Sequence, residues 1–366
     1  MIVDDSAFMR KVLETIFNAD ELLQTVGHAK DGREAVSLSE SLKPDVITMD
    51  INMPHVDGLQ ATAEIMTTNP RPIVIVSSES KEGAASTLRA LELGAIEFVA
   101  KPSGAIDLDM QSVKEELLRK VRMAAKVRVV RTASRIASKL QASSGTKAPA
   151  PAPAPAISRP PATSGLDQRF PVVVLAASTG GPATVMRIAP GFTQDFPAAV
   201  ILVQHMPAAF TTQYAAQLAE FTGIRVKEAE ANEALQPGTF YICPGGQHLR
   251  VTPTGRIQLD GTSGRINGYL PNIDATMESV AAFAGSLSIA GVLTGMGNDG
   301  ANGAKAIKAA GGLVLAQDEA TSVIFGMPAE AIKAGAVDQV LGIDDIYAAI
   351  EKRVLGICRP TPAGVR

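Results

Sequence analysis

The sequence has few of the features that mark membrane, secreted or metal-cluster proteins. It contains only two cysteines, Cys243 and Cys358, and their separation matches no metal-ligand spacing. No apolar run reaches the ~18 to 20 residues that cross a membrane, and the first residues lack the basic-then-apolar pattern of a signal peptide. A net charge of −3 gives no overall basic surface for nucleic acid. These absences favour a cytoplasmic protein with reduced thiols, without membrane insertion or nucleic-acid binding.

The chain does have enough length and apolar residues for more than one folded unit. Its 366 residues, 46% of them hydrophobic, suffice for about two domains with ordinary cores. Residues 142–168 are rich in Ala, Pro, Ser and Thr, a composition that favours extended polyproline II over a packed fold. We therefore expect one domain over residues 1–105, a basic helical extension and linker over 106–169, a second domain over 170–355 and a tail over 356–366.

Polar side chains in the first domain follow short apolar stretches that are typical of buried strands. They are Asp4, Asp5, Asp50, Ser77 and Lys101. Because strands alternate with helical segments, we expect an α/β fold with a doubly wound parallel sheet, whose strands all end at one edge. The five side chains then converge. Carboxylates suit a hard cation such as Mg2+, one of them can be phosphorylated, and the hydroxyl and the ammonium can contact the phosphoryl oxygens.

Residues 1–105 resemble the receiver domain of two-component response regulators, which has a flavodoxin-like fold. The resemblance is carried by Asp4-Asp5-Ser6, Asp50-Ile51-Asn52-Met53-Pro54 with Asp57-Gly58, Val76-Ser77-Ser78 and Val99-Ala100-Lys101-Pro102. It implies that a histidine kinase donates a phosphoryl group to Asp50. It also implies Mg2+ beside Asp4, Asp5 and Asp50, with Ser77 and Lys101 contacting the phosphoryl group.

Two further expectations follow from the receiver resemblance. Phe98 takes the place of the aromatic switch residue of receivers. Receivers begin with several more residues of first strand before the acidic pair, whereas here only Met1 to Val3 precede Asp4. Either the start of the sequence is assigned too late, or the first strand of this domain, residues 1–105, is truncated, and we expect the latter.

The second domain is organised around Val172 to Pro182, an apolar strand pattern that ends in a small-residue turn at Ser178. A serine at such a turn is either a nucleophile or a donor in a phosphate-binding loop. A phosphate loop of the Gly-Lys-Ser/Thr type is absent. A nucleophile needs a base and an acid that orients it, and His205 and Asp299 follow neighbouring predicted strands. Imidazole titrates near pH 6.5 and suits the base. The pattern favours the nucleophile.

Other residues compete for these roles. His28 and His55 lie in the first domain, where surface loops are the simplest interpretation. His248 follows a Pro-Gly-Gly turn and is the one serious rival for the base. Cys243 is a weaker nucleophile candidate, because no activating cation lies next to it in the sequence. An α/β-hydrolase is excluded, since that fold uses Gly-x-Ser-x-Gly and the chain order serine, acid, histidine.

The second domain resembles the catalytic domain of chemotaxis protein-glutamate methylesterases. The resemblance is carried by Ala177-Ser178-Thr179-Gly180-Gly181-Pro182, Gln204-His205-Met206-Pro207, Pro244-Gly245-Gly246-Gln247-His248, Leu293 to Gly300, Ala316-Gln317-Asp318 and Phe325-Gly326-Met327-Pro328. It implies a Rossmann-like domain with a β-hairpin excursion, for which the sequence indicates residues 239–260. Two departures stand out: Ala176 replaces a usual glycine, and Gly268 to Asp274 replaces a segment that is commonly basic and contains serine.

The same resemblance implies the roles of the site residues. Ser178 is then the nucleophile, His205 the base and Asp299 the acid that orients it, with backbone N–H groups near Thr179 and Met296 as the oxyanion hole. The implied substrates are glutamate methyl esters and glutamines of methyl-accepting chemoreceptors, and the hydrolysis needs no cofactor. The receiver either covers the catalytic face until it is phosphorylated or activates it by docking. The alternative function is an inactive receptor-binding or nucleotide-binding regulator.

Overall fold

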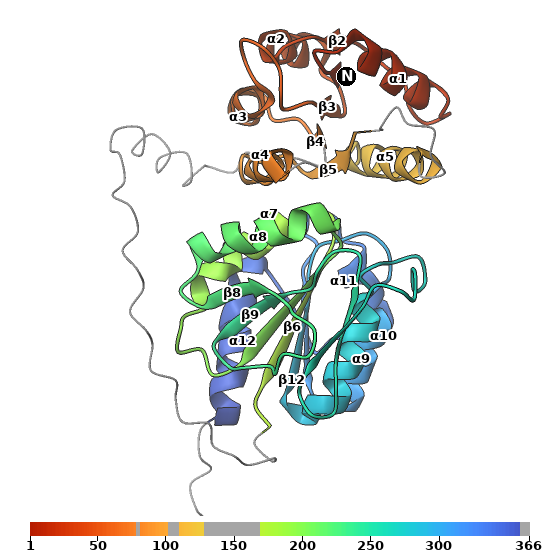
Figure 1. Cartoon of the computed structure of the whole chain (residues 1–366). Helices are drawn as coiled ribbons and strands as arrows, with labels where there is room; N and C mark the ends of the chain where they lie inside the picture. The colour runs from red at the N-terminus through yellow and green to blue at the C-terminus, as the bar shows by residue number, and fades with distance from the viewer. Residues whose placement is uncertain (78–80, 102–109, 128–168, 359–366) are drawn as a thin grey trace, which may run out of the picture.

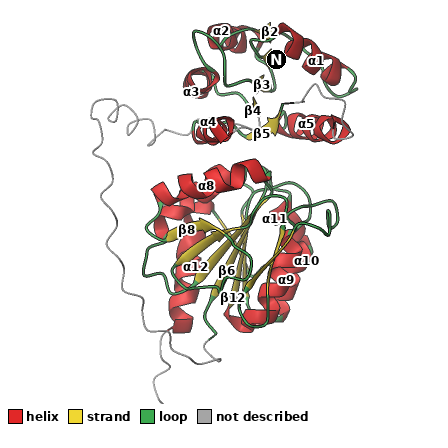
Figure 2. Ribbon diagram, viewed as in Figure 1, coloured by secondary structure: helices red, strands yellow, loops and turns green. Residues whose placement is uncertain are grey.

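The computed structural model describes residues 1–77, 81–101, 110–127 and 169–358 of the chain. Two α/β units lie one above the other, the N-terminal unit at the top of Figure 1 and the larger C-terminal unit below it. In each unit helices flank a central sheet (Figure 2). No helix in these ranges combines the length and the apolar character needed to cross a membrane.

The N-terminal unit has a five-stranded parallel sheet in the order β2-β1-β3-β4-β5. Its strands are β1 (Ile2–Val3), β2 (His28–Ala29), β3 (Ile47–Met49), β4 (Ile73–Ser77) and β5 (Glu97–Ala100). Its helices are α1 (Ala7–Asn18), α2 (Gly32–Leu42), α3 (Gly58–Thr68), α4 (Lys81–Glu92) and α5 (Met110–Ala124). This strand order is that of flavodoxin-like folds, as predicted.

Two details of this unit go beyond the sequence patterns. β1 has only two residues, yet it pairs with both β2 and β3 at the centre of the sheet. The expectation that His28 lies in a surface loop is wrong: it starts β2, where its exposed side chain contacts Glu14. A strand of two residues is too short to produce a recognisable alternation of apolar and polar side chains.

The Asp57-Gly58 pair fixes the start of α3 against the end of β3. The Asp57 carboxylate accepts a hydrogen bond from the Gln60 N–H at 2.7 Å and so caps the helix. Gly58 donates its N–H to the Ile51 carbonyl at 2.9 Å, and a Cβ at Gly58 would lie 2.1 Å from the Asp50 carbonyl oxygen. Glycine is therefore required where the helix start meets the residue predicted to be phosphorylated.

Helix α5 packs on the sheet of the N-terminal unit, although it begins after residue 105. Its Leu117 and Val121 are buried in one cluster with Val74 and Val76 of β4. The first domain therefore draws part of its core from beyond the predicted boundary. Residues 106–109 and 128–168 of the predicted extension and Ala/Pro-rich linker lie outside the described residues. The predicted tail starts too early at residue 356, because the last helix (Ile343–Cys358) continues to Cys358, and residues 359–366 lie outside the described residues.

The C-terminal unit has a seven-stranded parallel sheet in the order β14-β13-β12-β6-β7-β9-β8. Its strands are β6 (Val172–Ala177), β7 (Ala199–Gln204), β8 (Arg225–Glu228), β9 (Thr239–Ile242), β12 (Ser288–Val292), β13 (Leu313–Gln317) and β14 (Gln339–Leu341). Its helices are α7 (Gly181–Ile188), α8 (Ala208–Phe221), α9 (Ile273–Ala284), α10 (Ala301–Ala309), α11 (Met327–Lys333) and α12 (Ile343–Cys358), with short 3-10 turns η1 (Ala189–Gly191) and η2 (Gly285–Leu287).

The central strands of this sheet are buried on both faces, which explains their continuous apolar sequences. Val173 and Leu175 of β6 join a cluster with side chains of α7, α8 and α12. Val172 and Val174 join the opposite cluster with α9, α10 and α11. Because successive side chains of a strand point to opposite faces, a central strand such as β6 contributes to both cores, whereas the edge strands β8 and β14 are partly exposed.

A hairpin excursion is present but shorter than predicted. β10 (His248–Val251) and β11 (Ile257–Asp260) form a separate antiparallel pair. The predicted excursion began at Thr239, whereas β9 lies in the main sheet between β7 and β8. Since β9 is apolar on both faces, its burial pattern is that of a central strand rather than of a hairpin arm.

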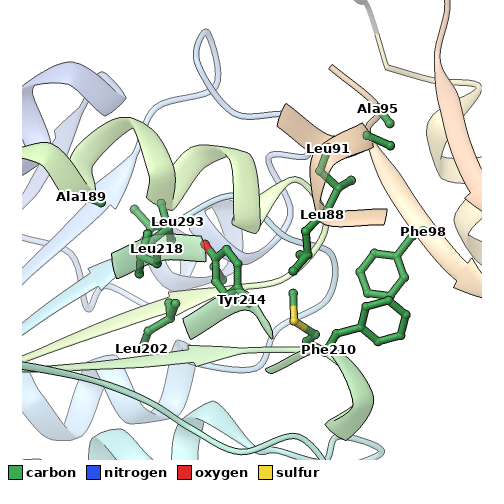
Figure 3. Close-up of a cluster of buried hydrophobic side chains, with 14 of the residues drawn as sticks. Leu88, Leu91, Ala95, Phe98, Ala189, Leu202, Phe210, Tyr214, Leu218 and Leu293 are labelled. Carbon is green, nitrogen blue, oxygen red and sulfur yellow. The ribbon is translucent and has the colours of Figure 1, made fainter. Parts of the chain in front are cut away.

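The two units contact each other through α4 and β5 on one side and α8 on the other (Figure 3). The ring centroids of Phe98 and Phe210 are 4.4 Å apart. Leu88 lies in the same buried cluster, and Gln217 of α8 donates a hydrogen bond to the Glu92 carboxylate of α4. An apolar contact of this kind joins the strand that leads to Lys101 with the helix that follows His205.

Candidate active site

Ser178 lies at the tight turn between β6 and α7. Its N–H donates to the Thr294 carbonyl at 3.0 Å, and its own carbonyl accepts from the Gly181 N–H at 2.8 Å. Gly180 has a φ of +76°, and a Cβ there would lie 2.5 Å from Val323. The turn therefore requires glycine and holds the serine at the carboxyl edge of the sheet, with 8% of its surface exposed.

His205 and Asp299 form a pair at the same edge. The Nε2 atom of His205 lies 2.9 Å from Oδ2 of Asp299, and the Asp299 side chain is fully buried. A carboxylate accepts hydrogen bonds, so Nε2 is the nitrogen that carries the proton in the neutral ring. Nδ1 is then the nitrogen left to act as a base.

The Asp299 carboxylate is held at the N-terminus of α9. Oδ1 accepts from the Asn272 side-chain amide at 2.9 Å and from the Asp274 N–H at 3.0 Å, while Oδ2 accepts from the Ile273 N–H at 2.8 Å. Helix N-termini favour negative charge, because their first N–H groups have no partner within the helix. The carboxylate is therefore fixed in orientation and stabilised as an anion before any substrate binds.

The Asp274 carboxylate accepts backbone hydrogen bonds at the start of α10, as the Asp299 carboxylate does at the start of α9. Its Oδ1 accepts from the Gly300 N–H at 2.9 Å and from the Gly303 N–H at 2.7 Å. Burial raises the pKa of Asp274, and the neighbouring Asp299 charge adds to the effect. Asp299, from the loop before α10, thus accepts N–H groups at the start of α9, and Asp274 of α9 accepts N–H groups at the start of α10, which locks Asp299 to the sheet edge.

The predicted oxyanion donors flank Ser178. A Cβ at Gly295 would lie 2.8 Å from the Ser178 Cβ, so glycine allows this loop to pass directly beside the serine. Met296 follows it, and the buried Thr179 follows the serine itself. Within the described residues, no protein group accepts a hydrogen bond from the N–H of either Thr179 or Met296. Both donors stay available for an oxyanion.

His248, the rival base, is a structural residue. Its ring is fully buried, Nδ1 accepts the Asn272 N–H at 3.1 Å, and Nε2 donates to the Gly264 carbonyl at 2.7 Å. Both nitrogens are occupied, so neither is free to take a proton from a serine. Its role is to hold the segment that carries Asn272. Cys243 is also buried, and burial raises the pKa of its thiol well above the ordinary value, which makes it a poor nucleophile.

Sequence reasoning missed two residues beside the site. Gln204 donates from Nε2 to the carbonyls of Ser178 at 2.8 Å and His205 at 3.2 Å, and so ties the two together. Its place next to His205 at a strand end was the available signal. The ring of Tyr269 stacks on His205 with centroids 4.8 Å apart and planes 14° from parallel. The signal in the sequence was its place in Gly268 to Asp274, a segment that departs from the pattern that the resemblance implies.

The residues predicted around Asp50 also come together. Lys101 Nζ lies 2.9 Å from Asp4 Oδ2 and 2.8 Å from Asp50 Oδ2. Burial raises the pKa of Asp50, although the hydrogen bond from Lys101 opposes this. Burial alone would lower the pKa of Lys101, but its hydrogen bonds to the two carboxylates raise it. Ser77 is buried at the end of β4, where its carbonyl accepts the Lys101 N–H at 2.8 Å.

The same edge can hold a divalent cation. One carboxylate oxygen from each of Asp4, Asp5 and Asp50 lies within 4.8 Å of the others. Two of these carboxylates are buried and the third is exposed, so the oxygens face a common point with access to solvent. An all-oxygen, anionic donor set of this kind fits Mg2+, which keeps several of its own waters when bound to proteins.

Two family models match different parts of the chain. Residues 173–350 match the CheB methylesterase family model and residues 1–112 the response regulator receiver domain model. The curated protein-glutamate methylesterase/protein-glutamine glutaminase of Symbiobacterium thermophilum is 40% identical over 363 residues, which is 97% of this chain and 96% of the relative. That of Pyrococcus horikoshii is 40% identical over 356 residues, 97% of this chain and 93% of the relative.

A solved structure is similar to about half of this chain. It is the CheB methylesterase catalytic domain of Thermotoga maritima, with 40% identity and a TM-score of 0.48, covering 50% of this chain and 98% of that chain. Fold, site and family models define the class of this protein as a response regulator with an enzymatic output domain. The chain belongs to the protein-glutamate methylesterase/protein-glutamine glutaminase family, whose members are hydrolases.

Proposed function

We propose that this chain removes methyl groups from glutamate γ-methyl esters on the cytoplasmic helices of chemoreceptors, and deamidates receptor glutamines, under the control of phosphorylation at Asp50. The observation that carries the proposal is the His205–Asp299 hydrogen bond of 2.9 Å beside Ser178 at one sheet edge. An inactive binding module would have no need for a buried, oriented carboxylate behind an imidazole. The site of action is the cytoplasm, where the receptor helices and the kinase lie.

The catalytic cycle has two steps with the same groups. Nδ1 of His205 takes the proton of Ser178 as Oγ attacks the γ-carbonyl carbon, while Asp299 stabilises the imidazolium. The N–H groups of Thr179 and Met296 hold the oxyanion, a contribution of about 3 kcal/mol per donor. Methanol leaves with the proton from His205, and water then hydrolyses the acyl-enzyme by the same route. With a glutamine substrate, ammonia is the leaving group.

Phosphorylation of Asp50 in the receiver domain controls the esterase activity in this proposal. Asp50 attacks a phosphoryl group presented by a phosphohistidine of the kinase, and the kinase imidazole leaves. Asp4, Asp5 and Asp50 would hold Mg2+, which neutralises the phosphoryl oxygens when it is bound. The Lys101 ammonium moves from the carboxylate of Asp50 to the new phosphoryl oxygens, and the hydroxyl of Ser77 donates to them.

The unphosphorylated receiver covers the catalytic face in this proposal. The Phe98–Phe210 contact supports it, and so does Arg119 of α5, whose guanidinium lies 3.9 Å from the Met296 sulfur. Phe98 lies two residues from Ala100 at the end of β5, next to Lys101. A change of partner at Lys101 therefore displaces the strand that contacts α8, and the interface loosens.

The direct test is methanol release from methylated receptor by the purified chain. We expect release without a phosphodonor and about 5- to 100-fold faster release with acetyl phosphate and Mg2+, because allosteric couplings have this size. Release that is indifferent to the phosphodonor would contradict receiver control but keep the esterase. No release from folded protein in either condition would favour the alternative, a receptor-binding or nucleotide-binding regulator without activity.

The interface can be opened by a single isosteric substitution. Gln217→Glu places a carboxylate against Glu92, whose side chain is 5% exposed. Like charges repel strongly where water is excluded, so we expect about 3- to 10-fold faster basal methanol release without a phosphodonor. The matched control is Glu92→Gln with Gln217→Glu, which restores a hydrogen bond between the same positions and should return the basal rate. Unchanged basal release in Gln217→Glu would argue against a covering receiver.

A further inference from the structure

Tyr269 joins the two halves of the catalytic apparatus. Its ring lies flat on the His205 imidazole, with centroids 4.8 Å apart and an angle of 14° between the planes. We propose that Tyr269 is a positioning residue that fixes the plane of the His205 ring and couples it to the oxyanion loop at Gly297. This inference rests on the proposed function, because it needs His205 to act as a base.

The segment that carries Tyr269 is built to hold the ring in place. Ile266 and Tyr269 exchange both backbone hydrogen bonds at 3.0 Å. Between them, Asn267 and Gly268 both have positive φ values, 52° and 89°, as in the tight turns that close hairpins. Arg265 donates to the Gly268 carbonyl at 3.3 Å. The backbone of Tyr269 is therefore fixed by its own turn rather than by contact with a substrate.

The hydroxyl end of Tyr269 packs against the loop that carries the second oxyanion donor. A Cβ at Gly297 would lie 2.1 Å from Tyr269 Oη and 3.2 Å from Cζ. Gly297 has a φ of +92° and follows Met296 directly. One end of the tyrosine thus touches the oxyanion loop while its face covers the base, so a shift of either group moves the other.

The Tyr269 ring stabilises the His205 imidazole more strongly when the imidazole is charged than when it is neutral. His205 becomes an imidazolium as it takes the serine proton, and a cation over an aromatic face is attracted by the ring quadrupole. The ring also shields one face of the imidazole from water, and 15% of the His205 side chain is exposed. The stack therefore favours the charged, correctly oriented form that exists during the reaction, which is an effect on turnover rather than on substrate binding.

The first experiment separates turnover from binding in the full chain. We expect Tyr269→Ala to lower kcat for methanol release about 10-fold while KM stays within about twofold. Sulfonylation of Ser178 by phenylmethanesulfonyl fluoride needs the base but no receptor, and it should slow by a similar factor. Tyr269→Phe retains the ring and should restore most of both rates. Leu270→Ala, on the same segment but without a ring to stack, is the matched control and should change neither rate by more than about twofold.

The second experiment tests the coupling to Gly297. Gly297→Ala introduces a Cβ that collides with the Tyr269 hydroxyl and also strains the backbone at positive φ. Tyr269→Phe removes the hydroxyl but not the strain. We therefore expect the double variant Tyr269→Phe with Gly297→Ala to be about 5-fold faster than Gly297→Ala alone, since neighbouring residues couple in this range.

The following results would contradict the role proposed for Tyr269 or the assignment of Ser178. Kinetic values of Tyr269→Ala within twofold of wild type in both assays would overturn the proposal. So would a raised KM with unchanged kcat and unchanged sulfonylation, which would make Tyr269 a substrate-binding residue. A double variant no faster than Gly297→Ala would overturn the coupling. Sulfonylation of wild type that is no faster than that of Ser178→Ala would instead contradict the nucleophile assignment, so the two failures are distinguishable.

Discussion

Replacing Ser178 by alanine lowers methanol release from methylated receptor to the background, a loss of about 10⁴-fold or more, without unfolding the protein. Removing the nucleophile of a serine-histidine-aspartate site has effects of this size, because the remaining groups have nothing to activate. The backbone hydrogen bonds that hold the turn, from Ser178 to Thr294 and from Gly181 to Ser178, do not involve the hydroxyl and survive the substitution.

The control for this prediction is another serine of the same domain. Ser286 is exposed in η2, before β12 and so at the opposite edge of the sheet, and Ser286→Ala should retain full turnover. Thermal unfolding of Ser178→Ala should stay within about 2 °C of the wild-type midpoint, as expected for a change of a few tenths of a kcal/mol. Turnover close to normal in this variant would refute the assignment of Ser178 as the nucleophile.

Asp299→Asn should lower kcat about 10³- to 10⁴-fold while the sheet edge stays folded. Oδ1 and Oδ2 of Asp299 each accept two hydrogen bonds, so an NH2 group in either position faces two donors. If it faces His205, the imidazole adopts the other tautomer and Nδ1 carries the proton, which leaves no base for Ser178. If it faces away, the Asn272 side-chain amide and the Asp274 N–H lose their acceptor, at a cost of about 1–3 kcal/mol for unsatisfied donors.

Asp274→Asn is the matched control, since it is the same change in the neighbouring carboxylate. Its Oδ1 receives both strong hydrogen bonds, from Gly300 and Gly303, and an asparagine carbonyl can receive them equally well. The pKa of Asp274 is raised by burial, so ionisation at neutral pH costs the folded state and a neutral side chain removes that cost. We expect little change in thermal stability at pH 7 and turnover within about tenfold of wild type. Equal losses in the two variants would contradict a specific role for Asp299.

Much of the fold and most of the candidate site could be predicted from local patterns. Apolar runs that end in Asp50, Ser178 and His205 marked strands of parallel sheets, and the carboxyl ends of such strands share one edge. The spacing of Ser178, His205 and Asp299 along alternating strands was therefore enough to expect that they meet. Weak strands were missed or misplaced: β2 is two residues long, β8 is a partly exposed edge strand, and β9 was placed in the hairpin.

The partners of each side chain could not be predicted from the sequence. His205 follows an apolar strand and His248 follows a Pro-Gly-Gly turn, so both were candidates, yet His248 is locked between Asn272 and Gly264 while His205 faces Asp299. The distinction depends on how a loop from elsewhere in the chain packs against each ring. Hydrogen-bond partners separated by tens of residues leave no periodic trace in the sequence, so both remained candidates until the structure was known.

The sequence by itself determined the two α/β domains, their family and the residues at the strand ends, because strand periodicity and short motifs are local properties of the chain. The tertiary structure decided which histidine is free to act, that the α9 N-terminus holds Asp299, that Tyr269 covers His205, and that Phe98 meets Phe210 across the domains. These contacts join segments far apart in sequence, and only the packing of whole helices and loops on the sheets brings them together.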